Sequence, residues 1–121
     1  MIKTDFVIEE YLCKGINVRL LSNLRFGTLK LNIECGRFIN QPHNERLCQC
    51  CNMNSIETEY HFVMVCPAYR QLRLRYFSKY YCSWPNMQKF CALLNAKSKK
   101  VIYNLICFLR DSWKLRSHVL S

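Results

Sequence analysis

The stretch "CQCCNMNSIETEYHFVMVC", residues 48–66, decides how this chain can be organised, because it holds four cysteines and a histidine. Cys48 and Cys51 form a C-x2-C pair, and His61 and Cys66 form an H-x4-C pair. Both spacings are typical of structural zinc sites, in which a C-x2-C turn points two thiolates at one position and a helix end supplies the other ligands. We therefore predict that these four residues bind one structural Zn²⁺.

The proline after this stretch supports the same prediction. On an uninterrupted α-helix, His61 and Cys66 would lie about 140° apart, since five residues turn through about 500°. Pro67 disfavours helical geometry at Cys66, so the helix that carries His61 is expected to end before the second ligand. Four protein ligands leave no open coordination position, which indicates a structural ion and not a catalytic one.

Two other residues compete as ligands, and a different interpretation stays open. Cys50 could replace a neighbouring cysteine, and His43 could bind from upstream, although neither keeps the C-x2-C turn. Alternatively, the cysteines are buried thiols and His61 is a hydrogen-bonded core residue, because free cysteine packs as a small hydrophobic side chain. Nine cysteines in a chain without an export signal favour metal binding over a disulfide framework.

The composition predicts a mainly α-helical fold. A length of 121 residues suits one domain, and only three glycines and three prolines leave little material for a turn-rich β fold. We expect a single helical domain over residues 1–121, with a central zinc-binding module at 46–67. The first ligand pair is expected on a short irregular or β-hairpin-like loop.

Before the cysteine cluster, the pattern predicts two helices and a connector. Thr4 can cap a helix over residues 4–13, and a second helix is expected over 18–25, before Gly27. In residues 28–48, apolar residues alternate briefly with others at Leu29, Leu31 and Ile33, and a glycine, a proline and polar residues follow. This segment is predicted to be extended or irregular.

After the cysteine cluster, apolar residues recur at helical spacing in three segments. Residues 68–81 predict a helix with a core stripe of Tyr69, Leu72, Tyr76 and Tyr80. The next helix is expected to begin after a Ser83 cap and to bury Met87, Phe90, Cys91 and Leu94. The last helix, capped by Ser98, is expected to bury Ile102, Leu105, Ile106, Leu109 and Trp113, with Cys107 packing at the stripe's edge.

The charge of the chain favours a polyanionic partner. The formal net charge is +10, which attracts RNA or DNA and makes such binding salt-dependent. Arginines mixed with aromatic residues just after the zinc module are typical of single-stranded nucleic-acid binding. The candidate nucleic-acid-binding residues are Arg70, Arg73, Arg75, Lys79, Arg25 and Arg37, with Lys30 as a possible extension.

Neither a membrane nor a secretory role is expected. The sequence has no run of eighteen apolar residues, and Asp5, Glu9 and Glu10 interrupt the place where a signal peptide would need an apolar block. We expect an intracellular protein, nuclear or cytoplasmic, without a membrane partner.

Three quoted segments resemble a known family. They are "LSNLRFGTLKLNIECGRFINQPHNERLCQCC", "ETEYHFVMVCPAYRQLRLRYF" and "FLRDSWKLR". Together they resemble the zinc-binding segment C-terminal to the polymerase in non-LTR retrotransposon reverse transcriptases and derived open reading frames. The matching positions are Glu34, Gly36, Arg37 and Phe38, then Glu45, Arg46 and Leu47, and then the four ligands. Cys35 stands where a small polar residue is more usual in the family. Of the residues that usually precede the first ligand pair, only Pro42 is present.

The resemblance implies a zinc module that helps to hold template RNA or target DNA, beside the polymerase domain of a longer parent polypeptide. Catalysis by this chain is not expected, because two-metal phosphoryl transfer needs clustered carboxylates and Asp5 and Asp111 are the only aspartates. The competing class is a zinc-stapled structural or protein-interaction domain with no nucleic-acid role. An exposed apolar patch would favour that class.

Overall fold

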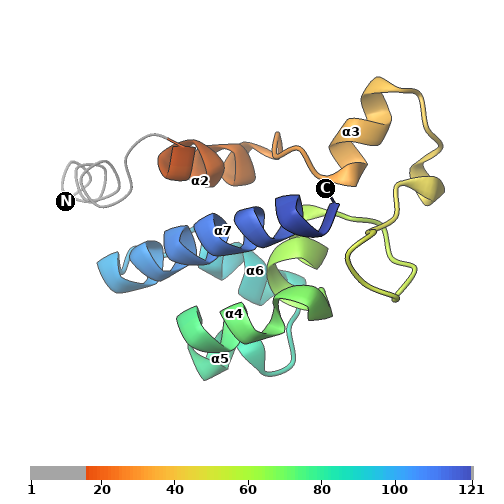
Figure 1. Cartoon of the computed structure of the whole chain (residues 1–121). Helices are drawn as coiled ribbons and strands as arrows, with labels where there is room; N and C mark the ends of the chain where they lie inside the picture. The colour runs from red at the N-terminus through yellow and green to blue at the C-terminus, as the bar shows by residue number, and fades with distance from the viewer. Residues whose placement is uncertain (1–15, 121) are drawn as a thin grey trace.

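The long C-terminal helix α7 (Lys99–Leu120) is the element against which the helices Ile16–Phe26 and Arg70–Tyr76 pack. The computed structural model describes residues 16–120, and these residues are mainly helical, as predicted (Figure 1). The expected helix over residues 4–13 lies outside the described residues. The Ser98 hydroxyl accepts a hydrogen bond from the backbone N–H of Val101 at 3.5 Å, so Ser98 caps α7. The predicted stripe is buried at Ile102, Leu105, Ile106 and Leu109, and Cys107 is buried beside it.

Helix α2 (Ile16–Phe26) confirms the second predicted helix. Leu20, Leu21 and Leu24 are buried, and the helix packs along α7. Gly27 ends the helix in the left-handed conformation, with a φ of +70°, which residues with a Cβ rarely adopt. The backbone N–H of Gly27 bonds to the carbonyl of Leu24, as is usual at such a helix end.

The prediction of an irregular connector over residues 28–48 was wrong at its centre. Helix α3 (Asn32–Phe38) lies there, and it begins where the Asn32 N–H donates to the side chain of Glu57 at 2.6 Å. The apparent alternation has another cause: Leu29 and Leu31 are buried in the core on the approach to this helix. A contact with a residue far along the chain therefore starts α3, and local sequence pattern does not report such a contact.

The segment after α3 forms the hairpin-like loop that the sequence predicted. A short 3₁₀ turn, η1 (His43–Glu45), leads to an isolated antiparallel bridge between Leu47 and Ile56. The Cys48 N–H donates to the Ser55 carbonyl at 2.8 Å, and the Glu57 N–H donates to the Arg46 carbonyl at 2.9 Å. Residues 48–55 form the tip of this hairpin.

The helix predicted over residues 68–81 is divided into shorter pieces. They are η3 (Pro67–Tyr69), α4 (Arg70–Tyr76) and α5 (Lys79–Cys82). The break comes at Phe77, which is extended and buries its ring 4.7 Å from that of Phe108 in α7. Burial of this large side chain outweighs the local helical preference. As a result Tyr80, predicted in the core, is 58% exposed.

Helix α6 (Met87–Leu94) begins later than predicted and turns a different face inward. Asn86, not Ser83, caps it, because the Asn86 side chain accepts a hydrogen bond from the Lys89 N–H at 2.9 Å. Phe90 is buried as expected, but Cys91 is exposed, so its assignment to the core was wrong. Met87 is exposed as well, and Leu93 takes the inner position instead.

The arrangement places the cysteine-bearing loop at one end of α7. In Figure 1, α2 and α3 lie on one side of α7, and α4, α5 and α6 lie on the other. The yellow to green loop that follows α3 lies near the C-terminal end of α7. None of the described helices is long and apolar enough to span a membrane.

Candidate metal centre

Four side chains from the loop and the following helix converge on one point. The donor atoms of Cys48, Cys51, His61 and Cys66 all lie within 4.8 Å of one another. The sulfurs of Cys48 and Cys66 are 3.8 Å apart, and the Cys51 sulfur is 3.4 Å from Nε2 of His61. This arrangement of soft and borderline donors is compatible with one bound metal ion.

The local backbone explains how His61 and Cys66 face the same point. A π-helical turn, η2 (His61–Val65), follows Tyr60, and the Cys66 N–H donates to the His61 carbonyl at 2.7 Å. This i to i+5 bond widens the turn and brings residue 66 closer to the face of residue 61 than an α-helix would. The chain leaves helical geometry at Cys66, where ψ is 122°, as Pro67 predicted.

The start of this helix is fixed as well. The Thr58 hydroxyl accepts a hydrogen bond from the His61 N–H at 3.1 Å, so Thr58 acts as the N-cap. A threonine three residues before the histidine ligand is a recognisable cap signal. The prediction did not use it.

The two buried sulfurs share a proton when no cation lies between them. The hydrogen bond with Cys66, followed by burial, raises the pKa of Cys48 to about 12. The same hydrogen bond lowers the pKa of Cys66. A metal ion would replace this proton, because thiolates and not thiols are the ligands.

The competing ligands can now be compared. Cys50, Cys48 and Glu57 form a second group whose donor atoms also approach within 4.8 Å. However, both carboxylate oxygens of Glu57 accept hydrogen bonds from Arg116, at 2.7 and 2.9 Å. His43 is exposed and belongs to neither of the metal-compatible groups among the described residues. The predicted set of four is therefore the better metal site.

A buried polar network supports the loop. Glu57 is 1% exposed, and besides Arg116 it receives the Asn32 N–H. The Asn32 side chain in turn donates to the Leu47 carbonyl at 2.6 Å, next to the first ligand. Burial alone would lower the pKa of Arg116, but the hydrogen bonds with Glu57 outweigh it and raise this pKa overall. The network joins α3, the loop and the end of α7.

The prediction missed this network, although one signal was present. Arg116 continues the buried stripe of α7 at helical spacing from Leu109 and Ser112, so a charge falls on an apolar face. A buried charge needs a partner of opposite sign. The sequence could have indicated that Arg116 has one, but not that it is Glu57.

Two further arginines support the site through backbone carbonyls. Arg46 donates to the carbonyls of Gln41 and Ile33, and its stem packs so closely on Gly36 that a Cβ there would lie 2.5 Å from Arg46 Cγ. Arg73 donates to the carbonyls of Val63 and of the ligand Cys66. Burial lowers the pKa of Arg73.

Arg73, one of the predicted nucleic-acid-binding residues, does not lie on the surface as that role requires. It is 6% exposed, because its guanidinium turns inward to the end of the π-helical turn. The remaining candidates are exposed: Arg70 and Arg75 on α4, Lys79 on α5, Arg25 on α2 and Arg37 on α3. Arg37 forms an ion pair with Glu34 at 2.7 Å.

The structure does not bring these candidates together in one place. The helices that carry Arg25 and Arg37 lie on one side of α7, and those that carry Arg70, Arg75 and Lys79 lie on the other (Figure 1). Beside Arg37, the exposed ring of Phe38 lies 5.2 Å from Nζ of Lys30. The exposed group on α4 and α5 directly follows the metal loop in the chain.

In comparisons with known proteins, no family model, no curated protein and no solved structure matches this chain.

Proposed function

We propose that this chain is a non-catalytic zinc-binding module of a retrotransposon-derived, reverse-transcriptase-associated protein. It contacts RNA or DNA through Arg70, Arg75 and Lys79, the exposed cations of α4 and α5. The observation that carries the proposal is the convergence of Cys48, Cys51, His61 and Cys66 within 4.8 Å.

The distances within the site support zinc as its metal. Around a tetrahedral Zn²⁺ with bonds of about 2.3 Å to sulfur and about 2.1 Å to nitrogen, two sulfurs lie about 3.8 Å apart. Sulfur and nitrogen then lie about 3.6 Å apart. The separations here are 3.8 Å for Cys48 and Cys66, and 3.4 Å for Cys51 and His61.

The role of the zinc is structural in this proposal. Four protein donors complete a tetrahedral shell, so no position remains for a water or substrate. Zinc binding contributes about 10 to 16 kcal/mol in zinc-finger peptides, which rivals the stability of about 5 to 15 kcal/mol typical of a whole domain. The metal therefore holds the loop, the π-helical turn and the network of Glu57 and Arg116 in place.

Charge and position support nucleic acid as the partner. Arg70, Arg75 and Lys79 are exposed on the elements that directly follow the metal site. Arg73 between them packs inward, where its bonds to Val63 and Cys66 couple α4 to the site. An exposed cation group on a rigid, metal-anchored helix suits phosphate contacts, which position a nucleic acid without reading its sequence.

The segments that resemble retrotransposon reverse transcriptases also surround the metal site. Gly36 and Arg46 of the first segment pack together, and Glu57 of the second pairs with Arg116 of the third. A resemblance spread over three segments thus corresponds to one set of contacts. This supports a common architecture with that family, and with it a polymerase domain as neighbour in a parent polypeptide.

The nucleic-acid role is tested by binding at varied salt. Zinc-loaded protein is titrated into fluorescent single-stranded RNA and DNA, and anisotropy is measured at several salt concentrations. We expect log K to fall linearly with log salt, by about 0.7 for each phosphate contacted. The triple variant Arg70→Ala, Arg75→Ala, Lys79→Ala should bind more weakly with a shallower slope. Equal slopes for both proteins would contradict the assignment.

A second candidate function is a zinc-stapled structural or protein-interaction domain. Exposed apolar side chains favour it: Phe26 is 80% exposed, Ile39 73% and Phe38 66%. Such residues are frequent at protein interfaces. A folded, zinc-loaded protein that binds neither RNA nor DNA at low salt would favour this second function.

A further inference from the structure

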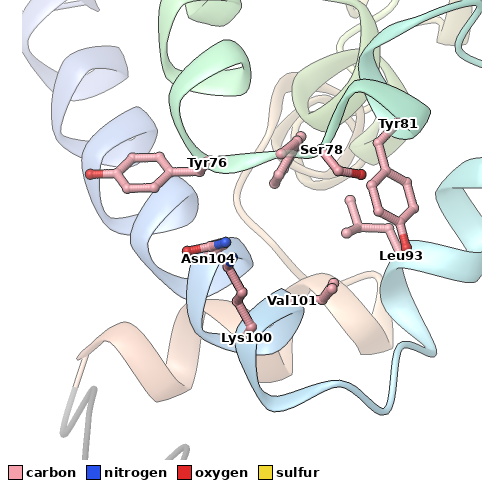
Figure 2. Close-up of a pocket in the computed structure, with 8 residues that line it drawn as sticks. Tyr76, Ser78, Tyr81, Leu93, Lys100, Val101 and Asn104 are labelled. Carbon is pink, nitrogen blue, oxygen red and sulfur yellow. The ribbon is translucent and has the colours of Figure 1, made fainter.

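A pocket of about 170 Å³ lies between the link from α4 to α5, helix α6 and the first turns of α7 (Figure 2). Its volume is below the range of about 300 to 1,000 Å³ that is typical of sites for drug-sized ligands. It therefore suits one small ring system. The residues that line it include Tyr76, Phe77, Tyr81, Leu93, Lys100 and Asn104.

The walls of the pocket suit a flat ring. Figure 2 shows Asn104 on one side and Tyr81 and Leu93 on the other, while the ring of Tyr76 points away from them and lies along α7. The Tyr76 hydroxyl donates to Asp111 at 2.6 Å, which holds this ring against α7 and leaves the space beside Tyr81 open. Aromatic walls favour flat π systems, and every nucleobase has a face that stacks on such a ring.

The pocket also contains a polar group that is free to pair with a ligand. Asn104 is half-buried, and its side chain hydrogen-bonds to no other described residue. An amide presents donors and an acceptor side by side, which matches the donor and acceptor edge of a base. An apolar peptide side chain would leave this amide unpaired, which is unfavourable in a half-buried position.

The charge at the rim selects for an anionic ligand. Lys100 is the only charged residue in the pocket lining, and it is exposed. Lys97 and Lys99 are exposed beside it in the chain, and Lys79 is exposed on α5. A ligand with a flat ring in the pocket and a phosphate near Lys100 would be a nucleotide.

We propose that this pocket binds one unpaired nucleobase, a pyrimidine by its size, of a single-stranded RNA or DNA. The backbone of that strand lies on the exposed cations of α4 and α5, so the inference rests on the proposed nucleic-acid role. Asn104 pairs with the base edge, the ring of Tyr81 stacks on the base, and Lys100 contacts the phosphate.

The test compares two strands that differ only in their bases. Oligouridine and an abasic strand with the same number of phosphates are titrated with the zinc-loaded full chain, and fluorescence anisotropy is measured. The wild-type protein should bind oligouridine at least about fivefold more tightly than the abasic strand. Asn104→Ala should reduce this preference, because the base edge loses its partner while stacking remains, and it should leave the abasic affinity unchanged. Gln88→Ala, an exposed amide on α6 outside the pocket lining, should keep the preference.

The outcomes separate this inference from the function on which it rests. Equal binding of both strands by the wild-type protein, with normal salt dependence, would overturn the pocket and leave the nucleic-acid role intact. No binding of either strand at low salt would overturn both. As a second measurement, addition of uridine 5′-monophosphate should shift the side-chain amide NMR signal of Asn104. An unmoved signal at saturating nucleotide would also overturn the pocket, whatever the variant's stability.

Discussion

Arg116 and Glu57 form a buried ion pair, although they are 59 positions apart in the sequence. The Nη2 atom of Arg116 lies 2.7 Å from Oε1 of Glu57, and the two side chains are 10% and 1% exposed. Glu57 directly follows the Leu47 and Ile56 bridge, whereas Arg116 lies near the end of α7. The pair therefore couples the geometry of the metal loop to the longest helix.

Removal of one partner of this pair should destabilise the protein more than removal of both. Arg116→Met leaves Glu57 charged and buried, and we expect the free energy of unfolding to fall by about 3 to 5 kcal/mol. The double variant Arg116→Met, Glu57→Met should recover most of this loss. Chemical denaturation of the zinc-loaded proteins measures both values. A double variant whose loss equals the sum of the losses in Arg116→Met and Glu57→Met would show that the charges are not coupled.

Two arginines of α4 should affect different properties. Arg73→Ala removes the bonds to the carbonyls of Val63 and Cys66, and we expect a loss of unfolding free energy of about 3 kcal/mol, together with weaker zinc binding. Arg75→Ala, on the exposed face, should leave stability within about 0.5 kcal/mol of the wild type. Chemical denaturation of both variants, with and without a zinc chelator, measures the loss of stability and the loss of zinc binding separately. Similar stability loss in both variants would contradict the inward role of Arg73.

Two glycines are required for different reasons. Gly36→Ala would place a Cβ 2.5 Å from Cγ of Arg46, and overpacking of this kind destabilises by about 1 to 3 kcal/mol. Gly27 has open space around it, but its φ of +70° favours glycine. Gly27→Asn should therefore be tolerated better than Gly27→Val, since asparagine adopts this conformation more readily. Thermal unfolding of the three variants checks both explanations, and a neutral Gly36→Ala would contradict the close contact.

The metal ligands and the helical fold could be predicted from the sequence because both depend on local information. The four predicted ligands are the ones that converge in the structure, and they follow from local spacing and from the proline after the last of them. They are Cys48, Cys51, His61 and Cys66, followed by Pro67. The stripe of α7 follows in the same way from helical periodicity.

The errors arose where distant contacts override local pattern. Phe77 leaves helical geometry to pack on Phe108, and Asn32 begins α3 through its bond to Glu57. Arg73 turns inward because it pairs with carbonyls at the end of the π-helical turn, not with solvent. No pattern within a single helix reports these partners.

Zinc affinity should rise with pH. Without the metal, the hydrogen bond with Cys66 and burial keep the pKa of Cys48 at about 12, so its thiol is protonated at neutral pH. Zinc binding must release that proton, so the apparent affinity should increase as protons become scarcer. Isothermal titration calorimetry in buffers of different ionisation enthalpy counts the protons released. The same affinity at about pH 6 and at about pH 8 would contradict thiolate ligation.

The predicted ligand set can be tested by replacing a ligand cysteine, and Cys91 provides a matched control. Cys66 is buried among the four converging donors, whereas Cys91 is exposed on α6. Cys66→Ser should lose stoichiometric zinc and loosen the fold. Cys91→Ser should keep both.

The most direct measurement is the number of zinc ions per chain, determined by native mass spectrometry on protein purified without added metal or chelator. One tightly held zinc in the wild type and in Cys91→Ser, and none in Cys66→Ser, is the predicted result. A folded wild-type protein without zinc, or equal metal loss in both variants, would contradict the metal centre.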